Sequence, residues 1–107
     1  MNHAQLDRRS LEFGRRIAAR LRVEPALLDV ARGNLHRWQS RPDTGEALRR
    51  CYAEWEALLA QLDAGQTASL LEREDEEAAL LRQNSPFAGV LGPREVWRIK
   101  REFAHAA

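Results

Sequence analysis

The chain of 107 residues is long enough for one domain and too short for two independent hydrophobic cores. Apolar residues make up 44% and charged residues 31%, which excludes a disordered chain. No apolar run approaches the roughly 20 residues that cross a bilayer. The formal net charge is +1, but residues 1–50 carry +5 and residues 51–107 carry −4. The basic first half suits either an ordinary solvated surface or a face for an acidic partner.

The N-terminus lacks the hydrophobic region of a signal peptide. Cys51 is the only cysteine, so no internal disulfide can form. We therefore expect a cytoplasmic protein. Residues 1–107 should form a single helical domain, with residues 1–3 and 104–107 frayed.

Two helices are predicted in the first forty residues. The first runs from about Ala4 to Arg22, and Gly14 within it indicates close packing by a neighbouring helix. The second begins at Pro25, a residue suited to the first turn of a helix, and ends near Ser40. Asn34 lies beside the apolar stripe of this second helix, so its amide needs a hydrogen-bond partner.

A third helix is predicted after the turn at residues 41–45, with Asp43 or Thr44 as its N-cap. It continues to about Leu62, and Gly65 is expected to end it. Its apolar residues repeat every three or four positions without a gap, so we expect this helix to be the central one. They are Leu48, Cys51, Trp55, Leu58, Leu59 and Leu62.

A fourth helix is predicted to begin at Ser69, because Ser69 and Glu72 have the spacing of a capping box. The stretch Asn84-Ser85-Pro86 should end it. The following residues, up to Trp97, are apolar but have neither a helical nor a strand period. They predict a loop pressed against the fold.

Gly92-Pro93 opens a last helix. The fold class is therefore all-α: a bundle-like array of about five helices, with an irregular apolar loop before the last one.

No pattern of catalytic or metal-binding residues is present. The three histidines are scattered, and Glu102 with His105 supplies only one of the pairs that a di-iron bundle needs. Cys51 lies on an apolar stripe, where a small buried hydrophobe is the usual role. Gly89 and Gly92 lack the lysine and the preceding strand of a phosphate loop. We expect no cofactor, no metal and no enzymatic activity.

Residues 17–38 resemble a helix-turn-helix, with Ala18 in the first helix, Val23 after the turn and Leu28 in the recognition helix. Arg22 occupies the turn position that usually holds glycine. Two ordinary antiparallel helices fit the same pattern, so both interpretations stay open. If DNA is bound, promoter DNA would be the target. The contacting residues would be Arg15, Arg22, Asp29, Arg32, Asn34 and Arg37.

Three stretches carry a resemblance to a known group of proteins. They are Ala31 to Trp38, which contains Asn-Leu-His-Arg-Trp, Trp55 to Leu59, and Leu81 to Trp97, which contains Ser-Pro-Phe-Ala-Gly-Val-Leu. Together they are similar to small bacterial helical proteins that serve as non-catalytic partners in two-gene toxin–antitoxin or phage-defence modules. Members of that group often have Glu-Arg-Trp where this chain has Glu95-Val96-Trp97.

The resemblance implies an antitoxin-like protein that binds and restrains a second protein, possesses no catalytic residues and leaves homo-oligomer formation open. Two of the three tryptophans are expected in the core. Trp97, if half exposed, would anchor such a contact with Arg94, Arg98 and Arg37, since tryptophan and arginine are enriched at binding hot spots. A purely structural role is the other interpretation for each tryptophan. The partner-binding candidates are Asn34, Arg37, Trp38, Ser85, Pro86, Phe87, Arg94, Glu95, Trp97 and Arg98.

Overall fold

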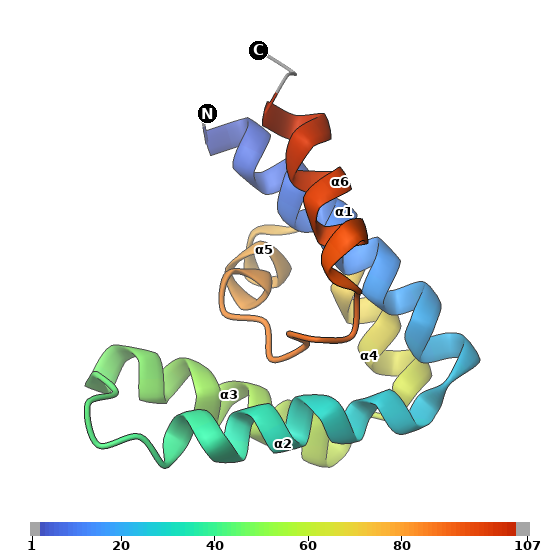
Figure 1. Cartoon of the computed structure of the whole chain (residues 1–107). Helices are drawn as coiled ribbons and strands as arrows, with labels where there is room; N and C mark the ends of the chain where they lie inside the picture. Colours follow the sequence, from blue (N-terminus) through green and yellow to red (C-terminus); the bar gives the residue numbers. More distant parts are fainter. Residues whose placement is uncertain (1–2, 105–107) are drawn as a thin grey trace.

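The computed structural model describes residues 3–104, and this part of the chain is all-helical, without a strand (Figure 1). The all-α prediction is confirmed, with six α-helices where about five were expected. The expected fraying at residues 1–2 and 105–107 lies outside the described part, whereas His3 and Ala104 belong to helices. The elements are α1 (His3–Val23), η1 (Pro25–Leu27), α2 (Leu28–Gln39), α3 (Glu46–Gln61), α4 (Ala64–Leu71), α5 (Glu76–Gln83) and α6 (Pro93–Ala104).

The helices form two arms (Figure 1). One arm contains α1 with α4, α5 and α6 packed against it, and the other is the antiparallel pair of α2 and α3. The loop that joins α5 to α6 lies between the two arms. Within residues 3–104 no helix is both long and apolar enough to cross a membrane.

The prediction that the third helix is central is wrong, because α1 holds that position. α3 packs mainly on α2 and buries only Trp55 and Leu59, while Leu48 near its start is exposed. An unbroken apolar repeat indicates that a face is covered, but it does not indicate how many neighbours cover it.

Gly14 lets α4 approach α1 closely, as the sequence predicted. A Cβ at this position would overlap the carbonyl oxygen of Leu71 and would lie 2.9 Å from Cδ of Arg82. The close contact places the C-terminus of α4 directly on the first helix.

The region predicted as one fourth helix contains two. Asp63 caps α4 by accepting a hydrogen bond from the backbone N–H of Gln66 at 2.8 Å, and the Gln66 side chain accepts from Asp63 N–H. Ser69 lies inside α4 and Glu72 at its end, so the capping box predicted there is wrong. Asp75 caps α5 instead, accepting from Ala78 N–H at 2.9 Å.

Two further predicted helix ends differ. Gly65 belongs to the first turn of α4, because α3 has already ended at Gln61. Neither Asp43 nor Thr44 caps α3: the N-cap is Gly45, without a side-chain hydrogen bond. The Thr44 hydroxyl donates instead to the carbonyl of Trp38 and closes the turn between α2 and α3.

Candidate functional site

The loop between α5 and α6 is held by Asn34 of α2. The Asn34 amide donates to the carbonyls of Pro86 and Ala88, at 2.8 and 2.9 Å. Arg37, one turn further along α2, donates to the amide oxygen of Asn34. The expectation that Asn34 needs a partner is confirmed, and the Asn-Leu-x-Arg-Trp motif has a structural use. It fixes the loop to the second arm.

Trp55 of α3 contacts both the end of α5 and the loop that follows it. Its indole N–H donates to the carbonyl of Leu81 at 2.9 Å, and its ring meets Phe87 edge-on, with 5.9 Å between ring centroids. Pro86, Phe87, Val90 and Leu91 are buried. The loop therefore contributes four side chains to the core, while Ala88, Gly89 and Gly92 are exposed.

Burial divides the predicted partner-binding residues. Asn34, Pro86 and Phe87 are buried, and Ser85 is half-buried. Trp38 is half-buried, with its ring 5.3 Å from that of Tyr52. These residues offer little surface to another protein.

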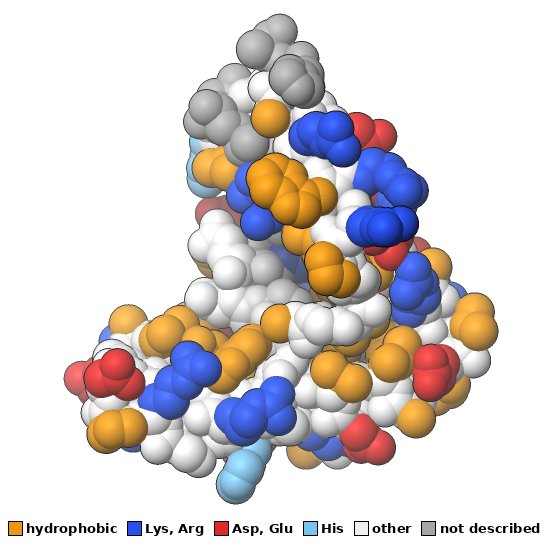
Figure 2. Space-filling model, viewed as in Figure 1, with side chains coloured by type: hydrophobic (Ala, Val, Ile, Leu, Met, Phe, Trp, Pro, Cys, Tyr) orange, Lys and Arg blue, Asp and Glu red, His pale blue; other side chains and the backbone are white. Residues whose placement is uncertain are grey.

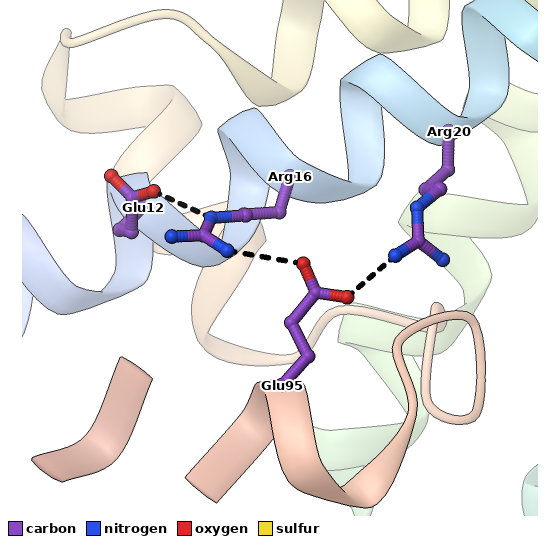
Figure 3. Close-up of polar contacts among 4 residues, drawn as sticks. All are labelled: Glu12, Arg16, Arg20 and Glu95. Atoms are coloured by element: carbon purple, nitrogen blue, oxygen red, sulfur yellow. Dashed lines mark hydrogen bonds and ion pairs between the residues drawn. The ribbon is translucent and has the colours of Figure 1, made fainter. Parts of the chain in front are cut away.

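Glu95 connects α6 to α1 (Figure 3). One carboxylate oxygen accepts from Arg16 at 3.2 Å and the other from Arg20 at 2.6 Å. Arg16 also donates to Glu12 at 2.9 Å. The hydrogen bonds to Glu12 and then to Glu95 raise the pKa of Arg16. The predicted binding residue Glu95 thus faces inward, where it orients α6.

The opposite side of α6 carries an exposed aromatic patch bordered by basic side chains (Figure 2). Trp97 is 65% exposed, the largest exposed aromatic side chain of the described residues. Three arginines surround it and line a shallow hollow with it. We call this surface the Trp97 face: Pro93, Arg94, Trp97, Arg98 and Arg101.

Arg101 was missed by the sequence reasoning. Positions 94, 97, 98 and 101 follow the spacing of one helical face, and this signal was present in the sequence. Among the described residues none of the three arginines of the Trp97 face takes part in an ion pair. Their charge is therefore available to an acidic surface.

Most residues of the predicted DNA-binding surface already have protein partners. Arg22 pairs with Glu72 at 2.5 Å. Their hydrogen bond is the main reason that the pKa of Glu72 is lowered. Arg32 contacts Asp29 at 3.0 Å and the carbonyl of Leu59 at 3.2 Å.

Two more residues of that surface serve the fold, since Asn34 is buried and Arg37 donates to it. Arg15 is exposed. Val23, predicted to lie just after the turn, is 86% exposed.

A second hollow lies between α1 and the loop before α6. Its volume is about 570 Å³, and mostly apolar side chains of α1, the loop and the first turn of α6 line it. They include Leu6, Phe13, Ile17, Phe87, Leu91 and Val96. We call it the α1–loop cavity. It has no residue in common with the Trp97 face.

Arg82 of α5 forms part of the wall of this cavity and is only 9% exposed. Its Nε donates to the Ser10 hydroxyl at 3.1 Å. Nη1 donates to the carbonyls of Leu71 and Arg73, at 3.3 and 2.5 Å. Those carbonyls lie at the negative end of α4. Burial lowers the pKa of Arg82 from its ordinary value.

Among residues 3–104 no group of three or more histidine, cysteine, aspartate or glutamate side chains could hold a metal ion. His105 of the Glu102–His105 pair lies outside the described part. Cys51 is half-buried, and the Asn84 amide donates to its sulfur at 3.6 Å.

No protein-family model, curated protein or solved structure matches this chain. The resemblance to toxin–antitoxin partner proteins thus remains an expectation from the residues quoted above.

Proposed function

We propose that this protein is a non-catalytic protein-interaction module, antitoxin-like in that it binds and restrains a partner protein. The contact surface in this proposal is the Trp97 face rather than the buried loop. One observation carries it: a tryptophan that is 65% exposed stands among three arginines that have no acidic partner in the described chain.

The composition of this surface supports a protein contact. Tryptophan and arginine are the residue types most enriched at binding hot spots, where a central aromatic side chain fills an apolar socket. The aliphatic stems of arginine pack beside an indole while their guanidinium groups pair with carboxylates. The partner that fits has an apolar socket with an acidic rim.

The Trp97 face is also held in place before a partner binds. Ile99 on the inner side of α6 is buried, and Glu95 joins the helix to Arg16 and Arg20. A surface that is already ordered loses less conformational entropy on association. The loop before α6 is also held in place, because Asn34 donates hydrogen bonds to its carbonyls. Asn34 therefore supports binding indirectly, by ordering the segment that leads into α6.

The DNA-binding alternative has less support. Five of its six candidate residues are engaged in hydrogen bonds within the protein, and Asn34 is buried. An electrophoretic shift with DNA of the chain's own promoter, weakening steeply with salt, would nevertheless favour it. In our proposal no such shift occurs at low salt.

Co-expression with the product of the neighbouring gene tests the proposal. Tagged wild-type chain should retain that product in the cytoplasmic fraction, while the charge reversal Arg98→Glu should release it. Arg50→Glu is the matched control, because Arg50 is an exposed arginine on α3, far along the chain from α6. If neither the wild-type chain nor the control retains the neighbouring product, the proposed function is wrong.

A further inference from the structure

We propose that the α1–loop cavity binds a small amphiphile with an apolar body and one carboxylate, such as a medium-chain fatty acid. The site is separate from the Trp97 face and does not depend on the proposed protein contact.

The size and lining of the cavity suit an apolar body. Pockets for small molecules have volumes of roughly 300–1,000 Å³ and are lined mostly by apolar side chains, with a few polar groups that orient the ligand. The α1–loop cavity, at about 570 Å³, lies in that range. Phe13, Ile17 and Leu91 supply apolar walls from two separate segments of the chain.

The loop wall is fixed rather than collapsible. Asn34 holds the carbonyls of Pro86 and Ala88, and Trp55 packs against Phe87 from behind. Gly14 and Leu71 close the floor where α4 meets α1. A cavity bounded by such contacts persists without a ligand, which reduces the loss of entropy when one binds.

Arg82 is the reason for proposing that the charged end of the ligand is negative. No carboxylate lies within ion-pair distance of its guanidinium group among the described residues. Nε and Nη1 have partners, but no hydrogen bond from Nη2 is formed within residues 3–104. Nη2 is not among the nitrogens that are both enclosed and unpaired. In this proposal the ligand carboxylate accepts a hydrogen bond from Nη2 and completes an ion pair with Arg82.

The rim adds to this preference. Arg9 lies at the cavity with a single acid, Asp7, whose carboxylate is 3.8 Å from His3. Leu6, also at the cavity, is 41% exposed and offers apolar surface at the entrance. The arrangement combines an apolar interior with more basic than acidic groups, as an anionic amphiphile requires.

Isothermal titration of the full chain with three probes of equal chain length tests the charge assignment. The probes are decanoate, decanol and decyltrimethylammonium, and the two ionic probes are kept below their critical micelle concentrations. A charge-assisted hydrogen bond predicts that decanoate binds roughly tenfold more tightly than decanol, with the cation weakest. Equal affinities for the three probes, or no binding of decanoate, would overturn the proposal.

A pair of substitutions locates the site without disturbing the buried guanidinium. Leu6→Glu places a negative charge at the entrance and should weaken decanoate binding several-fold, whereas Leu6→Lys should not. Circular dichroism confirms that both variants are folded. Equal decanoate affinities in the two variants would show that the probe binds elsewhere. Sedimentation velocity of the wild type with and without decanoate, and of Leu6→Glu, provides a third outcome. A dimer that persists in decanoate and dissociates in Leu6→Glu would mean that a second copy covers the cavity, and would also overturn the proposal.

Discussion

Asn34 shows how one side chain joins two parts of the chain far apart in sequence. Its amide satisfies two carbonyls of a loop that cannot form regular backbone hydrogen bonds. Arg37 orients that amide, because a guanidinium group donates only to the oxygen and thereby directs the nitrogen toward the loop.

Replacing Asn34 with alanine should lower the free energy of unfolding by about 2–3 kcal/mol, since two carbonyls lose their donor. Urea denaturation measures the change. The control is Gln39→Leu, because Nε2 of Gln39 is buried and has no hydrogen-bond partner within residues 3–104. Gln39→Leu should change the free energy of unfolding by no more than about 0.5 kcal/mol, or should increase it. Equal losses in both variants would refute the role of the Asn34 amide.

Alanine substitutions at Gly14 and Gly33 can be compared directly, because both glycines lie within helices. Gly14→Ala should destabilise the protein by about 1–3 kcal/mol, because its Cβ would overlap the Leu71 carbonyl. Gly33→Ala should stabilise it by up to about 1 kcal/mol, since only the flexible end of Arg37 lies near, at 3.4 Å. Thermal unfolding of both variants checks the opposite signs. A stable Gly14→Ala protein would mean that α1 and α4 lie further apart.

At the scale of elements, α5 depends on an ionised cap. Asp75 accepts hydrogen bonds from Arg73 at 2.6 Å and from Ala78 N–H, and these lower its pKa from 3.8 to about 2. A lowered pKa in the folded state means that the carboxylate stabilises the fold above about pH 4. That contribution is lost as the pH falls toward 2.

Asp75→Asn keeps a cap that accepts a hydrogen bond but does not titrate. Between pH 4 and pH 2 the unfolding temperature of the wild type should therefore fall more steeply than that of the variant. Parallel slopes of the two proteins over this range would show that Asp75 makes no titrating contribution.

The link between α6 and α1 is also an element-scale feature. Glu95→Gln should cost about 0.5–1 kcal/mol at low ionic strength and less at high salt, because the pairs with Arg16 and Arg20 are partly exposed. Amide hydrogen exchange should quicken in α6. Glu12→Gln removes a pair with the same Arg16 inside α1, so exchange in α6 should stay as in the wild type. Equal exchange in both variants would contradict the link.

For the whole molecule, periodicity in the sequence was enough to predict the all-α class and most helices. It also indicated that the loop before the last helix is pressed inward and that Asn34 is paired. The central position of α1 was not predictable, because amphipathic patterns do not identify the covering neighbour.

The burial of Arg82 could not be predicted from the sequence either. A charged residue in a helix usually faces solvent, and the burial of this one depends on the carbonyls of Leu71, at the end of α4, and of Arg73, just after it, brought near by tertiary packing. Tertiary packing also decides which of the predicted binding residues face the protein and which face solvent. Glu95 and Trp97 are two positions apart, and only the placement of α6 on α1 decides which one faces outward.

The most direct test of the account measures the affinity of the partner retained in co-expression for purified wild-type, Trp97→Ala and Leu80→Ala proteins. Leu80 is the control, as an exposed apolar side chain on α5 that lies outside the Trp97 face. We predict that Trp97→Ala weakens binding by roughly 30-fold, the size of a hot-spot loss, while the free energy of unfolding stays unchanged. Leu80→Ala should bind as the wild type does. Wild-type affinity in the Trp97→Ala protein would contradict the claim that the Trp97 face is the contact surface.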